Sequence, residues 1–158
     1  MKKLSSNSEN IFATVLSLIA VAVLLRLFGK YNTLTVAFGI LRSAIYIGLF
    51  FAWGVSIQRR IIQKNVRCYL TIISVLMVLW LFLRTVKYFF VTDTGVIRQL
   101  WYAYYIPMLL IPMFSVLTAV SLGKPENYKL PLWLKLFSIP TVMFILLVLT
   151  NDMHQLVF

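Results

Sequence analysis

The sequence is poor in the residues that build polar sites. Its 158 residues include four Asp and Glu, one Cys and one His. A single cysteine, Cys68, excludes a disulfide framework and a thiolate cluster, and a single histidine, His154, excludes a metal site with several imidazole ligands. Charged residues make up 12% of the chain and apolar residues 61%, against about 25% and about 45–50% in an ordinary soluble domain. This composition excludes a water-soluble globule, and we expect no metal and no cofactor.

The few charges are strongly one-sided, with 15 Lys and Arg and a formal net charge of +11. A positive excess of this size is also typical of nucleic-acid-binding domains. The cations lie between long apolar runs and form no basic stripe, so we expect no nucleic-acid partner. The chain also has no Gly-rich phosphate loop, no paired intramembrane carboxylates and no serine elbow. We therefore expect that it is not an enzyme.

Long apolar runs dominate what is present. A helix needs about 20 mostly apolar residues to cross the hydrocarbon core of a bilayer. Five segments meet or nearly meet this length, and they leave only short loops. The sequence therefore predicts an all-α, polytopic membrane helical bundle in the cell membrane, with the lipid bilayer as its partner and residues 1–158 in one transmembrane domain. The five spans are expected at about residues 11–28, 34–57, 68–90, 101–122 and 132–150.

The distribution of Lys and Arg predicts a cytoplasmic N-terminus, because positive loops stay inside. With that orientation nine cations lie on the inner side and six on the outer side. Four of the six outer cations fall inside or at the edge of a span, which leaves two in the outer loops. The loops alone compare nine with two. Residues 151–158 then emerge outside. Lys2 and Lys3 also resemble the start of a secretory signal, but the apolar run continues past Ala22, which favours an uncleaved anchor.

A stripe of small side chains follows the second span at a spacing of four residues. Small residues let helix backbones approach closely, which favours helix association in membranes. We interpret the stripe as a packing seam within the bundle, with a homodimer interface as the alternative. Its members are Ala44, Gly48, Ala52 and Ser56.

Three cations lie at membrane depth: Arg42 in the second span, and Arg84 and Lys87 in the third. Each costs a few kcal/mol if it faces lipid. Either they line an outward-open cavity for an anionic or other small-molecule ligand, with Asp93 or Asp152 as counter-ion, or they snorkel to the headgroups. The cavity hypothesis predicts seven ligand contacts: Arg42, Arg84, Lys87, Trp101, Tyr105, Asp152 and His154.

Aromatic residues crowd the outer start of the fourth span, with four rings in residues 101–105. They serve either as headgroup anchors or as the lining of a ligand vestibule. Trp80 lies one turn before Arg84, which is compatible with a guanidinium over an indole ring or with simple packing. Prolines within spans kink helices and can act as hinges in membrane proteins. The candidate hinges are Pro107, Pro112 and Pro140.

Two stretches together resemble the seven-transmembrane N-terminal sensor region of bacterial histidine kinases. The first runs from Trp101 through Tyr105 and Pro107 to Pro112, and the second runs from Pro140 into residues 149–158, LTNDMHQLVF. In that family an aromatic, proline-rich helix precedes one that ends in a Thr-Asn-x-x-His-x-hydrophobic signature, followed by three more spans and a cytoplasmic kinase. The resemblance covers about residues 66–158. It implies a bacterial sensor that lacks the C-terminal helices and the output domain.

Two functions from different classes follow. The first is an integral membrane sensor or receptor module for signal transduction, in which a ligand or a membrane state is sensed in the outer half of the bundle. Its signal would pass on by helix displacement between two arrangements of different ligand affinity. The alternative is a small multi-pass transporter or channel-like protein, in which the intramembrane cations define a permeation path.

Overall fold

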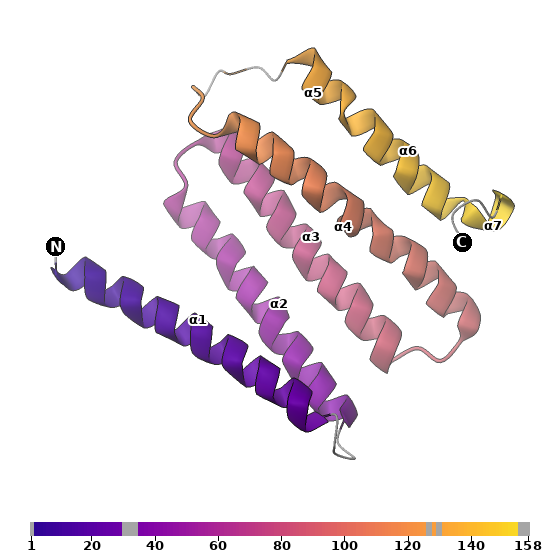
Figure 1. Ribbon diagram of the computed structural model, residues 1–158, viewed down its shortest axis with the longest axis horizontal. Helices are drawn as coiled ribbons and strands as arrows, with labels where there is room; N and C mark the ends of the chain where they lie inside the picture. Colours follow the sequence, from indigo (N-terminus) through magenta and orange to yellow (C-terminus); the bar gives the residue numbers. More distant parts are fainter. Residues whose placement is uncertain (1, 30–34, 126–127, 129–130, 155–158) are drawn as a thin grey trace. The chain divides into compact units, whose positions relative to one another are not determined.

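The computed structural model describes residues 2–29, 35–125, 128 and 131–154, and among these it describes the side chains of all but residues 2–8, 29, 135 and 154. These residues are mostly helical, with short connections at residues 61–63 and 90–93, and no strand occurs among them. The helices are α1 (Lys2–Gly29), α2 (Thr35–Arg60), α3 (Lys64–Phe89), α4 (Thr94–Ser121), α5 (Leu132–Leu136), α6 (Ser138–Leu149) and α7 (Asn151–His154) (Figure 1).

Five of these helical segments are long and apolar enough to cross a membrane, with mean hydropathies between 1.7 and 2.5. They are α1 to α4 and the stretch Leu132–Leu149, which contains α5 and α6. This confirms the predicted all-helical class and the five apolar segments. Large apolar side chains point outward on them: Phe12, Phe51 and Phe144 are each more than half exposed. Water disfavours such surfaces, whereas a lipid environment accommodates them.

The chain forms two compact units, residues 1–49 and 50–158. The division falls inside α2 and not in a loop, so loop lengths give no sign of it. The single domain expected from those loop lengths stays a prediction. The second unit holds every feature on which the site below depends.

Within the second unit, α4 packs along α3 on one side and along α6 on the other (Figure 1). Apolar side chains fill the space between these helices, among them Leu76 of α3, Met113 of α4 and Val148 of α6. The arrangement puts the start of α4 and the end of α6 at the same end of the unit. Residues near positions 94–105 therefore lie close to residues that follow the fifth apolar segment.

Hydroxyl side chains on these helices satisfy their hydrogen-bonding capacity locally. Each donates to a backbone carbonyl one turn earlier, at 2.7–2.8 Å in the examples below. This pattern lets serine and threonine sit on an apolar helix without an unpaired donor. The examples are Thr71, Thr85, Ser115, Thr118 and Thr150.

Helix α4 begins seven residues before the predicted span that starts at Trp101. Asp93 causes the early start: its carboxylate accepts a hydrogen bond from the backbone N–H of Val96 at 2.9 Å, which satisfies one of the open donors at a helix N-terminus. The first two turns of α4 are therefore helical despite their polarity. Arg98, which hydropathy assigns to a loop, lies on this helix.

The other end of α4 is held by a side chain from the α2–α3 turn. Gln63 Nε2 donates to the carbonyl oxygens of Ser121 and Lys124, both at 2.7 Å. Gly123 follows with a positive φ of 73°, the left-handed conformation that commonly ends helices and that glycine adopts without steric cost. The α2–α3 turn and the chain after α4 are thereby tied together.

The close approach of α2 to α3 occurs at Gly54. A Cβ built on Gly54 would lie 2.5 Å from Ser74 Oγ, and that hydroxyl donates to the Phe50 carbonyl at 2.8 Å. By contrast, a Cβ on Gly48 meets nothing within 4 Å, and Ala44 and Ala52 are exposed. The predicted small-residue stripe thus lies on a different face of α2 from this contact, and its role as a seam stays a prediction.

The three candidate hinge prolines lie in different settings. Pro107 is fully buried and Pro112 is exposed, and α4 continues through both of them. The fifth apolar segment, however, is interrupted at Phe137, between α5 and α6. Pro140 lies one turn after Leu136 and has no N–H to donate to it, which accounts for a break at this point. Hinge motion at these prolines stays a prediction.

Candidate functional site

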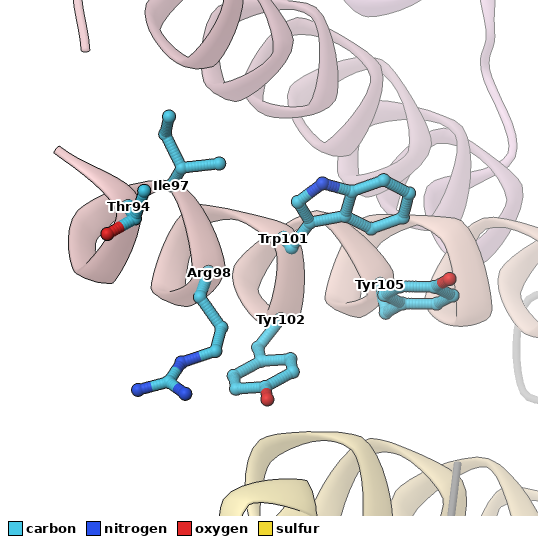
Figure 2. Close-up of a pocket in the computed structure, with 6 residues that line it drawn as sticks. All are labelled: Thr94, Ile97, Arg98, Trp101, Tyr102 and Tyr105. Carbon is cyan, nitrogen blue, oxygen red and sulfur yellow. The ribbon is translucent and has the colours of Figure 1, made fainter. Parts of the chain in front are cut away.

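An open groove of about 460 Å³ runs along one face of α4 near its start. Six side chains from the first three turns line it, at the three- and four-residue spacings that share a helix face. Figure 2 shows Ile97 and Trp101 on one side of the groove, Arg98 and Tyr102 on the other, and Tyr105 farther along the helix. The lining consists of Thr94, Ile97, Arg98, Trp101, Tyr102 and Tyr105.

Two groove residues hold the segment that follows the fifth apolar helix. The Tyr102 hydroxyl donates to Asp152 Oδ1 at 2.6 Å, and Arg98 Nε lies 3.6 Å from the same oxygen. Tyr102 is buried, whereas the side chains of Arg98 and Asp152 are 62% and 50% exposed. The short hydrogen bond to a carboxylate is the stronger of the two contacts, because exposed ion pairs contribute little.

Asn151 completes this junction from the α7 side. It is 5% exposed and interacts with Tyr102. A buried amide needs partners because an unpaired polar group in the interior is costly. Asn151 and Asp152 therefore fasten the first turn of α7 to Tyr102, one of the side chains that line the groove (Figure 2).

The opposite side of the groove is joined to α3 through a cation. Lys87 Nζ lies 3.7 Å from the centre of the Trp101 ring and 4.8 Å from that of Tyr88. Ammonium groups are attracted to the faces of aromatic rings, and most strongly to indole. Trp101 also stacks on Tyr105, with ring centres 6.0 Å apart. The groove wall is thus a stacked aromatic pair with a positive charge over one ring.

Behind this wall, Trp80 of α3 packs on Tyr104 of α4, with ring centres 5.4 Å apart. The indole Nε1 of Trp80 is buried and has no hydrogen-bond partner among the described residues. Trp80 therefore packs on an aromatic ring, which is one of the two interpretations of its spacing from Arg84. The indole that a cation contacts is Trp101, with Lys87 over it. Arg84 itself is exposed.

The structure brings four of the seven predicted ligand contacts to this groove or its rim: Lys87, Trp101, Tyr105 and Asp152. Arg84 lies on α3 outside the groove lining, and Arg42 belongs to the first unit. His154 is the last residue of α7, and its side chain lies outside the described residues. Their roles as ligand contacts stay predictions.

The sequence reasoning missed Arg98 and Tyr102 as partners of Asp152. It paired Asp93 or Asp152 with Arg42, Arg84 or Lys87, whereas Asp93 caps α4 and Asp152 meets Arg98. A signal was available: Asp93 followed by Thr94 is a typical helix start. A helix beginning there puts Arg98 and Tyr102 one turn apart on the same face.

Comparison with known proteins adds no family to these observations. No protein-family model, no curated protein and no solved structure matches the chain.

Proposed function

We propose that the chain is a multi-pass membrane sensor module, with a cytoplasmic N-terminus, whose signal arises from occupancy of the α4 groove. One observation carries the proposal: Arg98 and Tyr102 line the groove and also contact Asp152 of α7. A ligand in the groove competes with these contacts or reorients them. Occupancy and the position of α7 are then coupled.

The strength of the link suits a switch. A hydrogen bond to a charged group contributes about 1.5–3 kcal/mol, and about 1.4 kcal/mol changes an equilibrium tenfold. Loss of the Tyr102 contact is therefore enough to shift α7 between two populated arrangements. Because α7 directly follows α6, a displacement of α7 is passed to the helix that packs along α4.

A distance measurement between α4 and α7 tests this coupling. Spin labels are attached at Gln99→Cys and Met153→Cys, two exposed positions, in a Cys68→Ser background and in lipid nanodiscs. We expect Tyr102→Phe to raise the population of a longer distance about tenfold. The matched control Tyr88→Phe removes a hydroxyl from an exposed ring that does not line the groove, and it leaves the distribution unchanged.

An unchanged distance distribution in Tyr102→Phe would contradict the proposal. The transporter alternative is tested on the same purified chain by anion flux into proteoliposomes. A sensor module gives the flux of protein-free vesicles. Flux well above that background, abolished by Arg84→Gln or Lys87→Gln, would favour the transporter and overturn the sensor proposal.

A further inference from the structure

The groove on α4 combines an apolar surface with a positive rim. Ile97, Trp101 and Tyr105 supply an aliphatic side chain and two stacked rings. The groove is open and not enclosed, and Figure 2 shows the side chains that line it. Such a surface fits a long, flexible apolar chain better than a small polar molecule, because burial of apolar area is the main source of affinity that the groove offers.

Cations border the groove on both sides. Arg98 lines it and keeps 62% of its side chain exposed despite its contact with Asp152. Lys87 lies over the Trp101 ring on the α3 side, and in the described part of the chain its contacts are with aromatic rings and not with a carboxylate. A guanidinium binds phosphate through paired hydrogen bonds, and an ammonium binds it as a point charge.

The nearby carboxylates are already engaged. Asp93 accepts from the N-terminus of α4, and Asp152 accepts from Tyr102. Among the described residues, neither carboxylate forms an ion pair with Lys87. The positive rim therefore complements a negative headgroup, whereas a zwitterionic headgroup would bring a third cation to a site that already has two.

We propose that the occupant of the groove is an anionic phospholipid of the surrounding bilayer, an inference that rests on the proposed sensor function. Its acyl chain lies along the Ile97–Tyr105 face, and its phosphate contacts Arg98. A phosphate on Arg98 competes with Asp152 for the guanidinium and also repels the Asp152 carboxylate, which accepts the hydrogen bond from Tyr102. Lipid binding therefore weakens the contact between α4 and α7. The stimulus is then the anionic lipid content of the leaflet at this end of the helices.

Quenching of Trp101 fluorescence tests the lipid class. Trp53, Trp80 and Trp133 are replaced by Phe, and the chain is placed in vesicles that contain acyl-brominated phosphatidylglycerol or phosphatidylcholine. We expect an apparent affinity about fivefold higher for the brominated anionic lipid, as one basic contact near the membrane surface provides. Arg98→Gln removes this preference.

A matched variant separates the site from bulk charge. Arg84→Gln removes the same charge from an exposed position outside the groove lining, and we expect it to keep the preference. Native mass spectrometry of the chain with all four tryptophans repeats the comparison, so that the result does not depend on the folding of the triple variant. There, phosphatidylglycerol adducts outnumber phosphatidylcholine adducts, and Arg98→Gln equalises them.

Equal quenching by the two lipids in the wild-type groove would overturn the lipid assignment. Equal losses in Arg98→Gln and Arg84→Gln would also overturn it, because they indicate attraction by total charge. Neither result affects the spin-label test of Tyr102→Phe, which decides the sensor proposal by itself. Conversely, a clear lipid preference with an immobile α7 keeps the binding site and rejects the sensor function.

Discussion

Gly54→Ala is the most informative perturbation of the packing in the second unit. The added Cβ would lie 2.5 Å from Ser74 Oγ and 3.3 Å from Ser74 Cβ. Rotation of the Ser74 hydroxyl away from the new methyl group breaks its hydrogen bond to the Phe50 carbonyl. Ser74 is 3% exposed, so its hydroxyl would lose its partner without gaining water.

The structure sets the size and sign of the effect. An unsatisfied buried polar group costs about 1–3 kcal/mol, and overpacking of a core also costs about 1–3 kcal/mol. Only one of these costs applies at a time, since either the side chain rotates or the helices separate. Replacing glycine by alanine within a helix returns up to about 1 kcal/mol. Subtracting that gain leaves an expected net loss of up to about 2 kcal/mol in the free energy of unfolding.

Gly48→Ala is the matched control on the same helix, because its Cβ meets nothing within 4 Å. It should leave stability unchanged or slightly raised. The free energy of unfolding is measured by circular dichroism in mixed micelles as the fraction of dodecyl sulfate rises. A second control, Gly54→Ala with Ser74→Ala, should be less destabilised than the sum of the two single variants. Equal effects of Gly48→Ala and Gly54→Ala, or strict additivity of Gly54→Ala with Ser74→Ala, would contradict a close contact between Gly54 and Ser74.

Two further predictions use the same unfolding assay. Gln63→Leu removes the donor that caps the end of α4 and should cost about 1–3 kcal/mol. The control Gln99→Leu, at an exposed position of α4, should cost less than about 0.5 kcal/mol. Similar losses in the two variants would argue against the cap. Trp80→Phe keeps a ring against Tyr104 and removes the unsatisfied N–H, so its free energy of unfolding should stay within about 1 kcal/mol of that of the wild type. Trp80→Ala should lose about 3–5 kcal/mol. Equal losses in the two variants would contradict this prediction.

The five long helices were predictable because the signal for them is local. Twenty apolar residues in a row identify a lipid-length helix without any knowledge of its neighbours. Hydropathy alone misplaced the start of α4, because the turn after Asp93 is polar. That turn is helical because the Asp93 carboxylate caps it. That error hid Arg98, which hydropathy placed in a loop.

The α4–α7 junction could not be read from hydropathy or spacing. Tyr102 and Asp152 are 50 residues apart, and their contact depends on how α6 packs along α4. Periodicity likewise identified a small-residue stripe on α2 but could not tell which face meets α3. The contact occurs at Gly54, two positions from the stripe member Ala52, where the lack of a side chain leaves room for Ser74 and its hydrogen bond to the Phe50 carbonyl.

The most direct test of the proposed topology is the sidedness of two exposed positions in a membrane. Ile62→Cys, in the α2–α3 turn, and Met153→Cys, in α7, are 89% and 86% exposed in the native chain, and each is introduced in a Cys68→Ser background. A membrane-impermeant maleimide is applied to intact cells and again after permeabilisation. We expect position 153 to react from outside and position 62 to react only after permeabilisation. Reaction of both positions from the same side, or the reverse pattern, would contradict the proposed topology and with it the outward-facing α4 groove.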